Sequence, residues 1–137
     1  MIGPAPQPVD LSGCAILIVE DEYHQAMDLR DEIERAGGRV IGPYPDSETG
    51  RSALRSIVAD CAVLDINLGA GPRFEMADAL RAANVPFLFL TGYDATIIPA
   101  RFAGIPRIQK PAPHPALLRM IATACRRTVI ERPSLPA

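Results

Sequence analysis

Two runs of consecutive apolar residues, each followed by acidic side chains, constrain the fold of this chain more than any other feature of its sequence. The first run is Cys14–Val19, which precedes Glu20 and Asp21, and the second is Cys61–Leu64, which precedes Asp65. Strands that are buried on both faces read as continuous apolar runs, and they are typical of parallel sheets covered by helices. The pattern therefore predicts a parallel sheet that brings carboxylates to one edge.

Helical patterns alternate with such runs along the chain. Apolar residues recur at spacings of three and four in four segments, which indicates helices with one buried face. The predicted faces are Ala26, Leu29, Ile33 and Ala36, then Leu54, Ile57 and Val58, then Met76, Ala77, Leu80 and Ala83, and finally Leu117, Leu118, Ile121, Ala122 and Cys125. Asp46 or Ser47 is expected to cap the second helix. Between 92 and 104 the pattern is weaker, because Pro99 interrupts poor helix formers, so any helix there is short.

Three further strands complete the expected sheet. They are 39–42, closed by Pro43 and Pro45, then 86–90 and 105–109. Five strands that alternate with helices predict an α/β fold with a doubly wound parallel sheet, helices on both faces and right-handed crossovers. With the strand order 2-1-3-4-5, the first and third strands flank the topological switch point, where such sheets bind their ligands. The carboxylates after those two strands would then meet in one crevice.

Length and composition exclude several classes of protein. The 137 residues fit a single domain with one core and leave no room for a second. With 22% charged residues and a net charge of -2, the chain has no basic surface for nucleic acid or for an anionic membrane. It also lacks a membrane-spanning run and the features of a signal peptide, so we expect a cytoplasmic protein. Pro-rich residues 1–12 and residues 128–137 are expected to be flexible tails of a domain spanning 13–127.

The cysteines suggest no cross-link and no metal site. Cys14, Cys61 and Cys125 are odd in number and far apart, and they form no Cys-x-x-Cys pattern. Neither a disulfide framework nor a zinc site is therefore indicated. We interpret all three as small side chains of the core.

Polar residues also follow the fourth and fifth predicted strands, as Thr91 and Lys110. The clustered acids would repel one another and raise their pKa values unless a cation neutralised them, and magnesium suits such a site because it binds carboxylates and phosphate oxygens together. Lys110 supplies a mobile positive charge and Thr91 a hydroxyl donor for a phosphoryl oxygen. The set predicts phosphoryl transfer, with Asp65 as the nucleophile that becomes an aspartyl phosphate.

Each of these residues also has a purely structural explanation. Glu20 and Asp21 could cap the first helix, and Thr91 could cap a following one. Asp65 could close a turn through its side chain, and Lys110 could be an ordinary solvated lysine. Because the spacing and the strand order agree for all of them, a shared site is the favoured interpretation.

Four motifs stand at the strand ends: Ile18-Val19-Glu20-Asp21-Glu22, Leu64-Asp65-Ile66-Asn67, Leu90-Thr91-Gly92 and Gln109-Lys110-Pro111. Through them the chain resembles the receiver domain of two-component response regulators. The resemblance implies a flavodoxin-like (CheY-like) sheet and phosphorylation of Asp65 by a sensor histidine kinase or a phosphotransfer protein. It also implies magnesium held by Asp21, Asp65 and the main-chain carbonyl of Asn67, with Glu20 acting through water. A cis Lys110–Pro111 bond would help to hold the lysine over the site.

A finer resemblance comes from Phe89-Leu90-Thr91-Gly92-Tyr93, followed by Arg101-Phe102 and Gln109-Lys110-Pro111. This pattern is similar to the FATGUY group of single-domain regulators, which implies kinases of the HWE or related type and a role in stress or cell-physiology signalling. Leu90 replaces the usual Ala of that group. Arg107 stands where many receivers carry a switch aromatic, and Ala112 follows Pro111 where an aromatic is common. The output switch is therefore expected to use Tyr93 or to be altered.

The expected function is that of a single-domain regulator that contacts a downstream protein target or acts as a phosphate sink. It would be a monomer or a weak, phosphorylation-dependent dimer. It would not be an enzyme beyond self-catalysed phosphotransfer and dephosphorylation. Two alternatives stay open. A small metal-dependent phosphatase or phosphotransferase could use the same acids, although its Asp-x-Asp motif is missing, and a receiver-like binding module could retain the residues without being phosphorylated.

Overall fold

A five-stranded parallel sheet forms the centre of the computed structural model, which describes residues 8–67, 71–93 and 95–131. The strands are β1 (Ala15–Val19), β2 (Arg39–Tyr44), β3 (Cys61–Asp65), β4 (Phe87–Thr91) and β5 (Arg107–Gln109). Their order is β2-β1-β3-β4-β5, and every neighbouring pair is parallel. The predicted fold class and strand order are confirmed.

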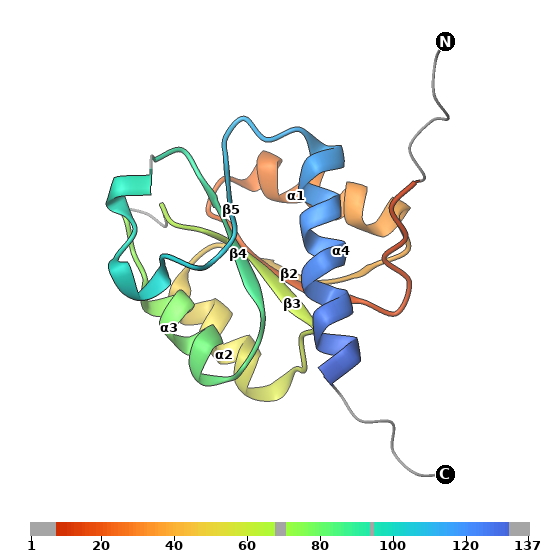
Figure 1. Cartoon of the computed structure of the whole chain (residues 1–137), viewed down its shortest axis with the longest axis horizontal. Coiled ribbons are helices and arrows are strands. Elements are labelled where there is room, and N and C mark those ends of the chain that lie inside the picture. Colours follow the sequence, from red (N-terminus) through yellow and green to blue (C-terminus); the bar gives the residue numbers. More distant parts are fainter. Residues whose placement is uncertain (1–7, 68–70, 94, 132–137) are drawn as a thin grey trace.

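Helices cover both faces of this sheet (Figure 1). They are α1 (Tyr23–Arg35), α2 (Ser47–Ser56), α3 (Glu75–Ala82) and α4 (His114–Glu131). Successive side chains of a strand point to opposite faces, so Ile16 and Ile18 pack with α1 and α4, whereas Leu17 packs in a second core with α3. Each of these two cores lies on one face of the sheet.

The predicted helix faces agree with the structure for α1 and α4, and for α3 except at Ala83, which follows the helix and is exposed. The predicted face of α2 does not agree. Leu54 packs at the edge of the core, whereas Val58 lies beyond the helix and is 70% exposed. Gly50 and Ala53 face the core instead. A Cβ on Gly50 would lie 3.0 Å from the sulfur of Met76, so a small residue there allows α2 to approach its neighbours closely. Asp46 caps this helix as expected, because its carboxylate accepts the N–H of Thr49.

β2 continues two residues beyond its predicted end. Pro43 does not stop it, because β2 is an edge strand, in which a residue without an N–H is tolerated. The register with β1 is irregular between Leu17 and Val19, and Gly42 there has a φ of +97°. As a result the carbonyl of Tyr44 accepts the N–H of Glu20 at 2.9 Å. The edge strand thereby holds the first acidic residue at the end of β1.

The segment between β4 and β5 forms two short 3-10 turns, η1 (Ala95–Ile97) and η2 (Ala100–Phe102), and no α-helix among its described residues. The short helix predicted for this region is thus reduced to single turns. The β5 strand is also shorter than predicted, because its pairing with β4 begins only at Arg107. The weak sequence pattern therefore corresponds to a segment with little regular structure.

Contacts with α3 anchor the η2 turn. Phe102 is buried, and the guanidinium groups of Arg81 and Arg101 lie 4.8 and 4.7 Å from the centre of its ring. Arg101 also donates two hydrogen bonds of 3.0 Å to the carboxylate of Asp78. Arg81 donates to the main-chain carbonyl of Arg101 at 2.6 Å. These contacts fix η2 but do not involve η1.

The ends of the folded region differ from the expected boundaries. Leu11, which was expected in a tail, is buried, and its N–H donates to the carbonyl of Ala36 at 2.7 Å. α4 continues to Glu131. No helix within the described ranges is long and apolar enough to cross a membrane.

The prediction of three separate core cysteines is wrong. Cys14 and Cys125 form a disulfide, with their Cα atoms 6.1 Å apart, and Cys61 alone remains a buried thiol. The sequence separation of 111 residues hides this pairing, which depends on α4 packing beside the start of β1.

Candidate functional site

The predicted acidic residues meet at the carboxyl ends of β1 and β3. These strands are neighbours, and the pairing of Val19 with Leu64 brings Glu20, which follows β1, and Asp65, which ends β3, to the same edge. Glu20 and Asp65 are buried, whereas Asp21 is exposed. One carboxylate oxygen from each lies within 4.8 Å of the others. The sheet therefore builds the predicted acid cluster.

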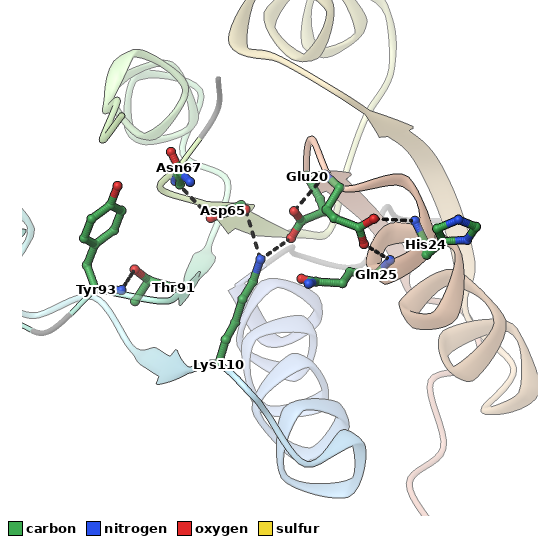
Figure 2. A network of polar contacts seen from close by, with 9 residues as sticks. Glu20, His24, Gln25, Asp65, Asn67, Thr91, Tyr93 and Lys110 are labelled. Carbon is green, nitrogen blue, oxygen red and sulfur yellow. Dashed lines mark hydrogen bonds and ion pairs between the residues drawn. The ribbon is translucent and has the colours of Figure 1, made fainter. Parts of the chain in front are cut away.

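Lys110 connects the two buried acids (Figure 2). Its Nζ donates to Glu20 Oε2 at 2.9 Å and to Asp65 Oδ2 at 3.1 Å, and its side chain is 22% exposed. The main-chain N–H of Lys110 donates to the carbonyl of Thr91, which fixes the end of β5 against β4. The Lys110–Pro111 peptide bond is cis, as the resemblance implied. Lys110 is therefore part of the cluster and not a freely solvated side chain.

The electrostatics of the cluster favour an additional cation. Burial, together with the neighbouring Asp65 carboxylate, raises the pKa of Glu20 to about 7, although the Lys110 ammonium offsets part of this effect. Burial also opposes the charge of Lys110, but its hydrogen bonds and its attraction to the two carboxylates outweigh this, and its pKa is raised. One ammonium faces three carboxylates, so the fully ionised cluster carries excess negative charge.

A cavity of about 550 Å³ opens over this cluster. Its lining consists of Glu20, Asp21, Glu22, Tyr23, Gln25, Asp65, Asn67, Gly92, Tyr93 and Lys110. A larger cavity of about 700 Å³ lies between α4 and the segments around β4, but its lining is mainly apolar and contains no carboxylate. Of these two cavities, the smaller one is therefore the one lined by carboxylates.

Comparisons with known proteins relate this chain to one family. No family model matches the chain. The transcriptional regulatory protein RprY of Bacteroides fragilis is 36% identical over 78 residues, which is 56% of this chain and 33% of RprY. The chain therefore spans about a third of the length of that curated relative.

Solved structures match over most of the chain. The signal receiver domain of a modulated diguanylate cyclase from Desulfovibrio desulfuricans is 31% identical, with a TM-score of 0.75, and the match covers 87% of this chain and 98% of that domain. The chain belongs to the family of response regulator receiver domains. A CheY-like receiver domain protein from Methanospirillum hungatei shares the fold at 22% identity, with a TM-score of 0.76 and coverage of 87% and 98%. The finer grouping with the FATGUY regulators stays a prediction.

In this receiver domain, Thr91 and Tyr93 lie on one side of Asp65, and Glu20 lies on the other (Figure 2). Thr91 is fully buried, and its Oγ1 accepts the N–H of Tyr93 at 2.9 Å. It therefore closes a turn after β4 and does not cap an α-helix. Because a hydroxyl can accept and donate at the same time, this bond leaves the hydroxyl hydrogen able to serve a ligand.

Asn67 is fixed next to Asp65 by a hydrogen bond of 2.9 Å, in which the Asn67 N–H donates to Asp65 Oδ1. It also forms an isolated antiparallel bridge with Pro72. The loop between these two residues lies partly outside the described residues. Asp65 thus closes a local turn, as the structural interpretation allowed, while its second oxygen remains bonded to Lys110.

Several residues around the receiver site were not singled out by the sequence. Glu22 caps α1, because its carboxylate accepts the N–H groups of His24 and Gln25 at 3.4 and 2.7 Å. The N-cap residue of α1 is therefore Glu22 and not Glu20 or Asp21, which were considered for this position. An acidic residue directly before a helical pattern is a cap signal that could have identified Glu22. Tyr23 is 67% exposed at the cavity mouth and had no sequence pattern to mark it.

Proposed function

We propose that this receiver domain accepts a phosphoryl group on Asp65 from a phosphohistidine of a sensor histidine kinase or a phosphotransfer protein. The observation that carries the proposal is the placement of the Asp65 carboxylate. It is buried at a sheet edge beside a cavity, 3.1 Å from the ammonium of Lys110 and close to two further carboxylates. Membership of the receiver family supports the same role.

The donor atoms fit a magnesium ion. The residues that line the cavity include three clustered carboxylates but no histidine or cysteine, and hard divalent cations prefer such oxygen ligands. Asp21, Asp65 and the main-chain carbonyl of Asn67 would hold the ion, with Glu20 acting through water. When bound, it would supply positive charge that offsets the repulsion between an incoming phosphoryl group and the carboxylates.

The residues of the chain have separate roles in the transfer. A carboxylate oxygen of Asp65 forms the new bond to phosphorus while the bond from phosphorus to the donor imidazole nitrogen breaks, and the imidazole leaves with the electron pair. Lys110 is already at hydrogen-bond distance from Asp65 Oδ2, so its ammonium can donate to a phosphoryl oxygen after small movements. Thr91 can donate its hydroxyl hydrogen to another phosphoryl oxygen.

The phosphorylated domain would act by contact with a downstream protein or as a phosphate sink. Hydrolysis of the aspartyl phosphate would reset it, so the domain would turn over only its own modification. We place this activity in the cytoplasm, where the partner kinases present their catalytic domains. Kinases of the HWE or related type are the proposed donors.

Labelling with a small acyl phosphate tests the proposal without requiring the partner. Intact-mass spectrometry should detect one phosphoryl adduct when magnesium is present and none when it is chelated. Asp65→Asn should abolish the adduct. Asp46→Asn, which changes an exposed aspartate at the cap of α2, is the matched control and should label normally. Undiminished labelling of the Asp65→Asn protein would contradict the assignment.

A second assay separates this function from the alternatives. A phosphatase would turn over small phosphate esters many times per protein molecule, whereas a receiver would not. A binding module that is never phosphorylated would show neither labelling nor a magnesium-dependent gain in stability. A screen of phosphotransfer from candidate histidine kinases would then identify the donor.

A further inference from the structure

The disulfide between Cys14 and Cys125 lies far from the acid cluster. Cys14 immediately precedes β1, whereas Glu20 follows the other end of that strand, so the full length of β1 separates them. Cys125 belongs to the half of α4 that is distant from Lys110. The sulfur pair is therefore a chemical feature that the phosphoryl site does not use.

A third polar group accompanies the two sulfurs. A carboxylate oxygen of Asp60 and the sulfur atoms of Cys14 and Cys125 all lie within 4.8 Å of one another, and all three residues are buried. Asp60 is held in place by Ala15, whose N–H donates to Asp60 Oδ2 at 2.8 Å while the Asp60 N–H donates to the Ala15 carbonyl. A fixed carboxylate disfavours a thiolate beside it, whereas the neutral disulfide carries no opposing charge.

The remaining cysteine does not compete for this bond. Cys61 is fully buried on β3. Burial, with a further contribution from the neighbouring Asp60 carboxylate, raises the pKa of its thiol to about 12. Because the thiolate is the nucleophile in disulfide exchange, Cys61 stays an unreactive thiol while the other two cysteines pair.

We propose that Cys14 and Cys125 form a reversible redox site that exchanges with small thiols and disulfides of the glutathione class. The state of this site controls how firmly the end of α4 is held against the sheet. Leu117 and Ile121 secure the half of α4 nearer Lys110 by burial in the core. Beyond them the core receives only small side chains among the described residues, those of Ala122 and Ala124, and the disulfide at Cys125 attaches the helix covalently. Its reduction therefore loosens the helix from Ala122 onward and leaves the phosphoryl site in place.

Exchange requires the end of α4 to open, because Cys14 and Cys125 are only 3% and 5% exposed. In the oxidation step the exposed Cys125 thiolate attacks a small disulfide, one small thiol leaves, and a mixed disulfide forms. The thiolate of Cys14 then attacks the Cys125 sulfur and displaces the second small thiol. Two electrons pass from the protein to the reagent, and the two cysteine protons end on the released thiols. An excess of small thiol reverses both steps.

A redox titration of the full chain tests this site. The protein is equilibrated in mixtures of reduced and oxidised glutathione, quenched with acid, denatured and alkylated. Intact-mass spectrometry then counts the alkylated cysteines. We expect one alkylated cysteine in oxidising mixtures and three in reducing mixtures, with a reversible transition between them. The Cys61→Ser protein should retain the transition, with no alkylated cysteine in oxidising mixtures and two in reducing mixtures. Because the wild-type protein is sufficient for this measurement, it does not depend on a variant that folds poorly.

Two further measurements test the loosening of α4 and the influence of the Asp60 carboxylate on the disulfide. Hydrogen exchange in residues 122–131 should be faster in the reduced protein, while residues 61–65 should be unchanged. Asp60→Asn keeps an oxygen acceptor for Ala15 but removes the charge, so it should accelerate exchange with glutathione several-fold without preventing the disulfide. Three free thiols in every mixture, a stable glutathione adduct in place of the internal bond, or a disulfide that opens only on unfolding would each overturn the proposal.

Discussion

The Nζ atom of Lys110, which follows β5, lies 3.1 Å from Oδ2 of Asp65, which ends β3, although these two strands are not neighbours in the sheet. β4 lies between them, and the lysine reaches across its end to the acid cluster. The same ammonium is 2.9 Å from Glu20 Oε2. A single side chain therefore links the carboxyl ends of β1, β3 and β5, and its removal should affect both the stability and the chemistry of the site.

The first prediction concerns the loss of this ammonium. Lys110→Ala leaves two buried carboxylates facing each other, so the metal-free protein should lose about 1–2 kcal/mol of its free energy of unfolding, a value discounted because the lysine remains partly solvated. Urea unfolding at pH 8 would measure it. Arg107→Ala, at an exposed cation on β5, should change stability by less than about 0.5 kcal/mol. The Lys110 variant should also transmit its signal poorly, and normal transmission in cells would refute the role of the charge.

The second prediction concerns pH and Glu20. The folded pKa of about 7 lies above the ordinary value of 4.5, so the native state holds more protons than the unfolded state between these limits. The contribution of Glu20 to the free energy of unfolding should therefore be fully present below pH 4.5, decline as the pH rises to about 7, and then level off. Urea unfolding with a metal chelator would show the decline.

Glu20→Gln provides the control for this titration, because it retains an amide that fits the same space but cannot ionise. Relative to wild type, this variant should become more stable as the pH rises from 5 to 8. Parallel pH profiles for the two proteins would show that another group is responsible.

The third prediction concerns the segment after Thr91. Phosphorylation adds charge and acceptor oxygens that can draw in the Thr91 hydroxyl, and a segment with little regular structure is readily reordered. Amide exchange in residues 92–98 should therefore slow on phosphorylation. Residues 99–106 should respond less, because η2 is already fastened to α3 through Arg101 and Phe102. Equal exchange in both forms would direct the search for an output surface to α1 or α4.

A fourth prediction concerns the contacts of Arg101 that hold η2 against α3. Arg101→Ala removes both hydrogen bonds to Asp78 and one cation that covers Phe102. Because this ion pair is about half exposed, the loss of global stability should be about 0.5–1 kcal/mol. The fast-exchanging region should nevertheless extend from 92–98 into 99–106. Arg51→Ala, at an exposed arginine of α2, should leave exchange in this segment unchanged.

The fifth prediction concerns the covalent link. Reduction of Cys14–Cys125 should lower the free energy of unfolding by about 2–4 kcal/mol, since the bond closes a loop of most of the chain and restricts the unfolded state. Chemical unfolding with and without reductant measures the difference. Cys125→Ser should match the reduced protein and should not respond to reductant. A reductant effect that persists in that variant would assign it to another cause.

Much of the site could be predicted from the chain because the acids lie at the ends of two buried strands. In a parallel sheet the ends of such strands share one edge, so Glu20 and Asp65 had to lie close together once the strand order was right. The direct contact of Lys110 with both carboxylates is a detail that the pattern did not contain. The contribution of Tyr23 to the cavity mouth was likewise not predicted.

The errors arose where burial depends on neighbours that are remote in the sequence. Val58 has the helical spacing of a core residue, but α2 ends before it and small residues make the contact instead. Pro43 looked like a strand terminator, and only the position of β2 at the sheet edge allows the strand to continue. Leu11 follows a Pro-rich stretch, yet the end of α1 supplies its hydrogen-bond acceptor.

By itself the sequence determined the order of strands and helices, the two-sided burial of the sheet and the gathering of carboxylates at one edge. These properties depend on the apolar period of each segment and on the geometry that all parallel sheets share. Only the tertiary structure decided which cysteines are bonded and which acids share the lysine. Those pairings depend on distances of a few ångströms between segments far apart in the chain, which only the packing of the folded chain establishes.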